Sequence, residues 1–106
     1  PSDALVGPVA VNTLHSLHLD AVFMGVHGIS ERAGFTTPNL MEADTNRAFI
    51  AGTDQVIVLA DHTKVGRDEL VTWASIDLVD TLITDRDVDP GLALEIEEAG
   101  VQVVRA

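Results

Sequence analysis

The chain has 106 residues and a formal net charge of −11 at pH 7, from six basic and seventeen acidic side chains. This length is typical of one domain, and a hydrophobic content of 46% excludes a disordered segment. The acidic charge argues against DNA binding by this chain, because phosphate contacts need a basic patch. Tyrosine is absent and only one tryptophan occurs, which leaves few aromatic side chains for stacking on bases.

The absence of cysteine excludes disulfides, zinc thiolate sites and thiol nucleophiles. It also fits a reducing compartment. No apolar run approaches the roughly twenty residues that a membrane helix needs, and no signal peptide is visible. We therefore expect a cytoplasmic protein.

The first seven residues form a lead-in, and a helix of about ten residues follows, ending near His18. Pro8 lies at the start of this helix, where a first-turn proline is tolerated. His15 and His18 are spaced three residues apart and can share one face of this helix. With no third ligand nearby, a solvated or partly packed pair is favoured over a metal site.

Ala21–Val26 is a continuous apolar run, which is typical of a strand buried on both faces of a parallel sheet. His27–Thr37 is glycine-rich and polar, and is interpreted as a loop. Asn39 with Glu42 resembles a capping box, so we expect a helix that runs to about Thr53.

The rest of the chain continues this alternation of strands and helices. It predicts a strand at Val56–Ala60, a loop at Asp61–Leu70, a short strand at Val71–Ala74, a turn at Ile76–Asp80, a strand at Thr81–Thr84, a helix after the Asp89 N-cap and a strand at Val101–Val104. The order predicts an α/β fold, a layered α/β/α domain with a mainly parallel, Rossmann-like sheet. We expect right-handed crossovers to place helices on both faces of the sheet.

Open α/β sheets bind ligands beyond the carboxyl ends of their strands. Three predicted strands end in polar residues: Gly25, His27 and Gly28; then Asp61, His62 and Lys64; then Thr84 and Asp85. Lys64 is the only lysine in an acidic chain, and it directly follows a buried strand. It is suited to a phosphate or hydroxyl group, although a solvated loop lysine is an equal alternative.

The other candidate residues have structural alternatives. The glycines Gly25 and Gly28 permit close backbone approach, but they do not match the dinucleotide pattern, and a structural turn is favoured. His27 suits a ligand donor or a general base, and equally a cap on the strand end. Thr36 and Thr37 precede a helix N-terminus, where N–H groups favour anions, although ordinary capping is favoured.

Asp85, Asp87 and Asp89 form an acidic group with the alternating spacing of some cation sites. Their spacing lacks the glycine and the distal glutamate of a calcium loop. Capping and solvation are favoured, so we expect no metal site. Trp73 is expected to pack against a helix, or alternatively to line an interface.

Several of these stretches together resemble a known family. The resemblance rests, in chain order, on Val6–Pro8, Leu19–Ile29, Gly34–Thr37, Glu42, Leu59–Gly66 and Leu82–Asp85. In this order they resemble the C-terminal effector domain of DeoR-type bacterial transcriptional regulators, and the likeness covers nearly the whole chain. That domain is similar in fold to ribose-phosphate isomerase and glucosamine-phosphate deaminase.

The resemblance implies an effector-binding domain of a transcriptional repressor of sugar metabolism, without catalytic residues or a cofactor. Family members bind phosphorylated sugars or related metabolites, which alter DNA binding by a separate N-terminal winged helix-turn-helix. Carried over to this sequence, the effector pocket would be lined by Gly25, His27, Gly28, Thr36, Thr37, Glu42, Asp61 and Lys64. A homo-oligomer, dimer or tetramer, is expected.

Two departures from the family pattern bear on function. Residues 1–106 match only the later part of the sensor domain, without the winged helix and without the earlier phosphate loop. The related isomerases also carry acidic residues in the loop after the first strand, whereas Gly25–Gly28 has none, so sensing is favoured over catalysis. An isomerase or deaminase fragment, with His27, Glu42 and Lys64 on the pocket rim, and a purely structural oligomerisation domain stay open as alternatives.

Overall fold

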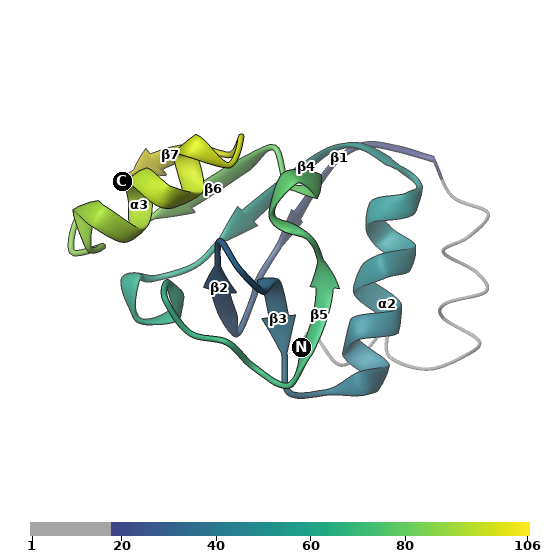
Figure 1. The fold of residues 1–106 in the computed structure, drawn as a ribbon. Coiled ribbons are helices and arrows are strands. Elements are labelled where there is room, and N and C mark those ends of the chain that lie inside the picture. The colour runs from purple at the N-terminus through teal and green to yellow at the C-terminus, as the bar shows by residue number, and fades with distance from the viewer. Residues whose placement is uncertain (1–17) are drawn as a thin grey trace.

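The computed structural model describes residues 18–106 (Figure 1). Most of the predicted first helix, with His15, lies outside these residues. Four parallel strands form the main sheet in the order β1 (Leu19–Met24), β4 (Thr53–Leu59), β6 (Thr81–Thr84) and β7 (Gln102–Arg105). A smaller antiparallel sheet has the order β2 (Gly28–Ser30), β3 (Gly34–Thr37) and β5 (Val71–Ala74). The helices are α2 (Leu40–Ala51) and α3 (Pro90–Glu98), and two short 3₁₀ turns are η2 (His62–Lys64) and η3 (Ile76–Leu78).

The predicted α/β fold with a parallel sheet is confirmed, and so are the starts of α2 and α3. Asn39 caps α2, because its Oδ1 accepts a hydrogen bond from the Glu42 N–H at 3.0 Å. Asp89 caps α3 in the same way through the Leu92 N–H at 3.1 Å, with Pro90 as the first helical residue. The Asn39 N–H donates to the Thr37 hydroxyl. Glu42 therefore does not complete a capping box, and its carboxylate is available elsewhere.

The prediction of a loop at residues 27–37 was wrong, because β2 and β3 form a hairpin there. Gly28 pairs with Thr36 and Ser30 with Gly34, and β3 then pairs with β5 far along the chain. Strands of three or four residues with little apolar alternation carry almost no local signal. Their stability comes from the non-local partner β5 and from burial, since all four residues of β3 are buried.

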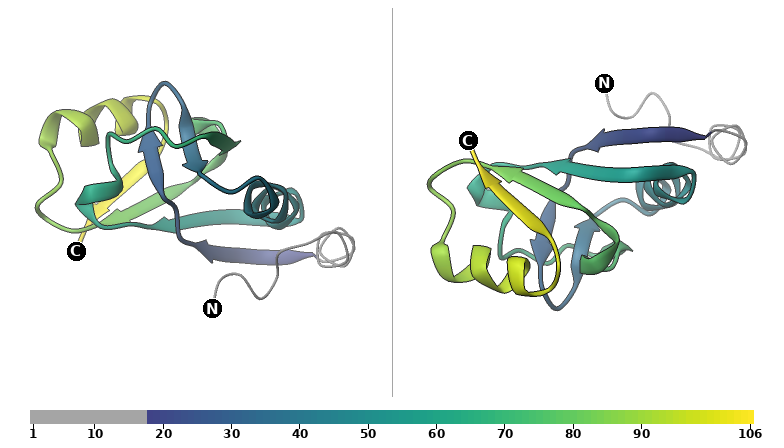
Figure 2. Two further views of the ribbon diagram at one scale, coloured as in Figure 1. Left: turned by 90° about the horizontal axis from the view of Figure 1, so that it is seen from below. Right: turned by 90° about the horizontal axis from the view of Figure 1, so that it is seen from above.

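Within residues 18–106, both helices lie on one face of the parallel sheet, whereas we expected helices on both faces. Figure 2 shows α3 and the small sheet on the same side of the parallel strands. A single core cluster joins Val58 and Leu82 from that face to Ala43 of α2 and Ile96 of α3. The strands follow one another across the sheet in the same order as in the sequence, β1-β4-β6-β7. Right-handed crossovers therefore place every connection between these strands on the same face of the sheet.

The opposite face of the sheet carries exposed apolar side chains in the described part of the chain. Phe23 is 64% exposed and Leu59 is 46% exposed. The prediction that the first strand is buried on both faces was therefore wrong for this structure. β1 also lies at the edge of the described sheet, where it pairs only with β4.

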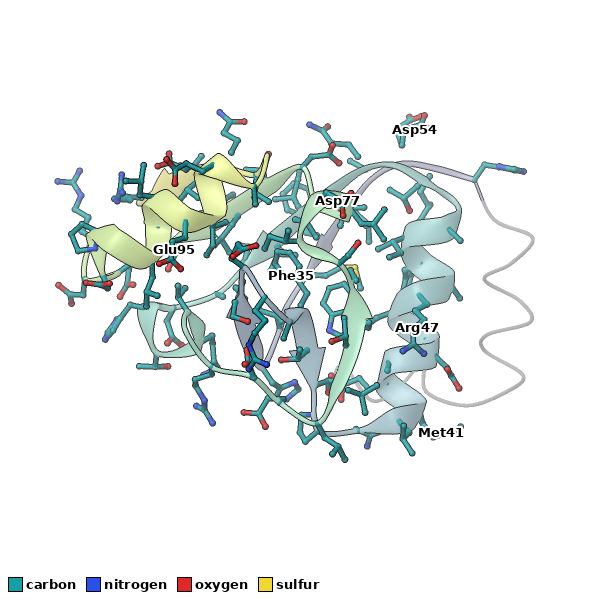
Figure 3. All side chains as sticks on the ribbon, in the orientation of Figure 1. Phe35, Met41, Arg47, Asp54, Asp77 and Glu95 are labelled. Carbon is teal, nitrogen blue, oxygen red and sulfur yellow. The ribbon has the colours of Figure 1, made fainter. Side chains whose placement is uncertain are left out.

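The core lies between the parallel sheet and the small sheet. Phe35 and Trp73 pack with ring centroids 5.8 Å apart, and their side chains are almost completely buried. Trp73 therefore packs on Phe35, which Figure 3 labels near the middle of the molecule, and β5 as a whole also contacts α2. Burial on this scale holds the small sheet on the parallel strands and fixes the loops that follow them.

Candidate functional site

The carboxyl ends of three parallel strands meet at one edge of the sheet. Met24 at the end of β1 is in register with Val58, and Leu59 at the end of β4 is in register with Ile83. The Ala60 N–H continues this pairing with a 3.0 Å hydrogen bond to the Ile83 carbonyl. The segments after β1, β4 and β6 therefore start side by side, as the sequence predicts.

The turn after β1 places His27 beside a carboxylate from α2. The His27 Nδ1 lies 3.6 Å from the Glu42 Oε1, and the His27 side chain is about half exposed. Gly25 is exposed, and a Cβ built on it would meet nothing within 4 Å. Gly25, His27 and Glu42 thus line an open surface, on which an imidazole and a carboxylate can share a ligand hydroxyl.

Gly28, Thr36 and Thr37 are buried, and their polar groups are engaged within the fold. The Thr36 hydroxyl donates to the Gly28 carbonyl at 3.0 Å and accepts from the Glu69 N–H at 2.9 Å. The Thr37 hydroxyl accepts from the Asn39 N–H at 3.3 Å. These contacts hold the hairpin to its neighbours. The structure therefore places these three predicted pocket residues behind the open surface and not on it.

The turn after β4 carries Asp61 and Lys64. Asp61 caps η2 by accepting from the Thr63 N–H at 2.8 Å, and its Oδ2 lies 3.5 Å from the Lys64 Nζ. Hydrogen bonds from Thr63 and the nearby ammonium hold the pKa of Asp61 below its ordinary value. The Lys64 side chain is about one-third exposed. Its ammonium has further N–H donors for a ligand beyond those directed at Asp61 and Thr63.

The hairpin joins these two turns. The Gly66 N–H donates to the Ile29 carbonyl at 2.7 Å, and Val65 forms a bridge with Ile29. Gly66 adopts a φ of +93°, a left-handed conformation that favours glycine. The loop after η2 is therefore tied to β2, and β2 follows directly from the His27 turn. Movement at one turn is constrained by the other.

His62 and Asp85 were predicted at strand ends but not among the pocket residues. Asp85 accepts from the His62 backbone N–H at 2.8 Å through one oxygen, and its other oxygen lies 2.8 Å from the His62 Nδ1. The hydrogen bond with Asp85 raises the pKa of His62, and the same bond lowers the pKa of Asp85. The sequence could have indicated this pair only by position, because His62 and Asp85 follow the strands β4 and β6, which are neighbours in the sheet.

Comparison with known proteins decides the family. A family model described as the DeoR C-terminal sensor domain matches residues 1–86. The chain belongs to the DeoR C-terminal sensor domain family. The resemblance inferred from the sequence is thereby confirmed.

Three relatives show how this sensor domain occurs in longer proteins. A transcriptional regulator of Haloferax volcanii named GlpR is 38% identical over 95% of this chain and 40% of its own length. The transcriptional repressor GlcR of Bacillus subtilis is 34% identical over 94% of this chain and 38% of its own length. The glycerol-3-phosphate regulon repressor of Escherichia coli K12 is 30% identical over 76% and 32% of the two lengths. The chain thus spans at most about two-fifths of these relatives.

A cavity of about 640 Å³ lies at the opposite ends of the parallel strands, near their amino ends. It is lined by residues around the amino ends of β4 and β6, among them Arg47, Asp54 and Asp77, whose places Figure 3 marks. Arg47 donates to the Thr72 carbonyl at 2.6 Å across this cavity wall. Open parallel sheets bind ligands beyond the carboxyl ends of their strands, so we take the turns after β1 and β4 as the candidate site.

Within residues 18–106, no helix is long and apolar enough to cross a membrane.

Proposed function

We propose that this chain is the later part of the sensor domain of a cytoplasmic, DNA-binding transcriptional repressor of sugar metabolism. Its effector is a phosphorylated sugar or a related metabolite, and a separate winged helix-turn-helix outside this chain contacts DNA. Membership of the DeoR sensor family supports this proposal. So do relatives named as transcriptional repressors, one of them for a glycerol-3-phosphate regulon.

The observation that carries the proposal is the position of Lys64. The only lysine of a strongly acidic chain lies beyond β4, and the open turn at Gly25 lies beyond the adjacent strand β1. An ammonium at this edge suits a phosphate group, because charge-assisted hydrogen bonds are stronger than neutral ones. Asp61 and Glu42 are suited to accept hydrogen bonds from sugar hydroxyls. The pairing of one cation with several acceptors fits a phosphosugar better than a simple anion.

Regulation follows if the effector binds two arrangements of an oligomer with different affinity. We propose a dimer or tetramer whose equilibrium is shifted by contacts at the Gly25 and Lys64 turns. Sensing does not require turnover, and the Gly25–Gly28 segment offers no carboxylate for proton transfer. The pairing of His27 with Glu42 is the feature that favours the alternative, a sugar-phosphate isomerase or deaminase.

A thermal-shift screen of sugar phosphates on the full-length protein tests the proposal. An effector at about 100 times its Kd should stabilise the protein by roughly 2.7 kcal/mol. The screen then compares Lys64→Met with Lys64→Arg. Loss of a charge-assisted hydrogen bond should weaken binding by roughly ten- to a hundredfold in Lys64→Met, and less in Lys64→Arg.

Three results would count against this proposal. If none of the sugar phosphates stabilises the protein at saturating concentration, the effector class is wrong. If the stabilising compound is turned over in a coupled isomerase or deaminase assay, the protein is an enzyme and the alternative holds. Stabilisation that is unchanged in Lys64→Met would remove Lys64 from the site.

A further inference from the structure

Three side chains of the kinds that bind metal ions lie together beyond the carboxyl ends of β4 and β6. His62, Asp85 and Asp87 each offer one ligand atom, and these atoms all lie within 4.8 Å of one another. His62 comes from η2 and the two aspartates from the turn that leads to α3, so two separate loops contribute. We propose that His62, Asp85 and Asp87 bind a divalent transition-metal ion, an inference that goes beyond the effector site.

The charges around His62 favour a cation over the phosphate of an effector. Asp61, Asp85 and Asp87 all act on the imidazole as negative charges. The ammonium of Lys64 is directed at Asp61 and Thr63. The two carboxylates of the cluster carry two negative charges, which a divalent ion neutralises when it displaces the proton from the imidazole. A phosphate at the same place would meet the unfavourable field of these carboxylates.

The ligand types select the metal class. Imidazole with carboxylates suits Zn²⁺, Mn²⁺ and similar ions, whereas Ca²⁺ takes oxygen ligands alone. Three protein ligands would leave coordination positions for water, as in open metal sites.

The cluster is accessible and partly ordered before any metal arrives. Asp85 is held by the His62 backbone N–H at 2.8 Å, which positions its carboxylate beside the imidazole. The side chains of His62 and Asp85 are each 41% exposed, and Asp87 is exposed. An ion can therefore reach the cluster from solvent without unfolding either loop.

The test is titration of the full-length protein with Zn²⁺ and with Mn²⁺ by isothermal calorimetry, in the absence of any sugar phosphate. The wild type is compared with His62→Asn, Asp87→Asn and Asp54→Asn. Asp54→Asn is the matched control, because it removes the same charge from an exposed residue at the amino end of β4. NMR spectra of the histidine side chains, recorded during a Zn²⁺ titration, identify which imidazole resonances shift on binding.

We expect one ion per chain, bound at least about tenfold more weakly by His62→Asn and Asp87→Asn, and equally well by Asp54→Asn. The His62 resonances should shift before those of the other histidines. Asp87 is exposed, so Asp87→Asn should leave the fold intact, as circular dichroism can verify. Binding that is unchanged in both cluster variants, or no binding of either ion at 100-fold excess over protein, overturns the proposal. The His62–Asp85 contact would then be an ion pair alone.

Discussion

Replacing Gly28 by alanine should destabilise the protein although the change adds only one methyl group. A Cβ at this position would lie 2.6 Å from the Arg67 carbonyl oxygen and 2.8 Å from the Thr36 Oγ1. The first of these atoms is backbone, and the second is held by hydrogen bonds to Gly28 and Glu69. Neither can move without disturbing the contact between the hairpin and the loop after η2. Overpacking of this kind typically costs about 1–3 kcal/mol.

The matched control is Gly25→Ala, three residues earlier in the same turn. A Cβ there meets nothing within 4 Å, and Gly25 is not among the described glycines with positive φ. It should be neutral or stabilising by about 0.4–1 kcal/mol, because alanine restricts the unfolded chain. Urea unfolding of both variants measures the difference. Equal free energies of unfolding for the two variants would refute the assignment of Gly28 to packing and Gly25 to the open surface.

Two further predictions concern the sheet and the hairpin. Leu82→Ala should cost about 2–5 kcal/mol, because Leu82 is fully buried, whereas Leu59→Ala on the opposite face should cost less than about 1 kcal/mol. Equal costs in chemical denaturation would mean that both faces are covered in the full-length protein. Hydrogen bonding from Ser30, together with the Arg32 guanidinium, lowers the pKa of Asp68. The ionised carboxylate therefore stabilises the fold at pH values above about 4, the ordinary pKa of an aspartate. That contribution should disappear as the pH falls through the lowered value. The stability difference between wild type and Asp68→Asn should therefore be complete at pH 7 and decrease as the pH is lowered below about 4, and a pH-independent difference would exclude this cause.

Long apolar segments and capping residues of this fold are predictable from the sequence. Val56–Ala60 lies almost entirely within β4, and the Thr81–Thr84 strand matches β6. The caps Asn39 and Asp89 mark their helices because their signals are local hydrogen bonds. The hairpin was missed because its pairing depends on β5, which local patterns do not register.

The faces of the sheet could not be predicted in the same way. Apolar strands such as β1 suggest burial on both sides, yet the side on which a helix packs depends on strand order. That order, β1-β4-β6-β7, is a property of the whole chain and places α2 and α3 together. Hydrophobic content alone therefore identified the strands but not the exposed face at Phe23 and Leu59.

The candidate site was predictable at the level of strand ends. Sequence order put Gly25, Asp61 and Asp85 after consecutive parallel strands, and their meeting at one edge follows from parallel pairing. Which side chains reach the surface was not predictable, because it depends on the hairpin. Thr36 is turned into the fold by Gly28 and Glu69, while His62 is turned toward Asp85.

A crystal structure of the full-length protein with the sugar phosphate that stabilises it most tests the central claim directly. We predict that the phosphate lies within hydrogen-bond distance of the Lys64 Nζ, with sugar hydroxyls near Asp61 and the Gly25 turn. A ligand seated instead in the cavity near Arg47 and Asp77, at the amino ends of β4 and β6, would contradict the assignment of the effector site to the carboxyl edge of the sheet.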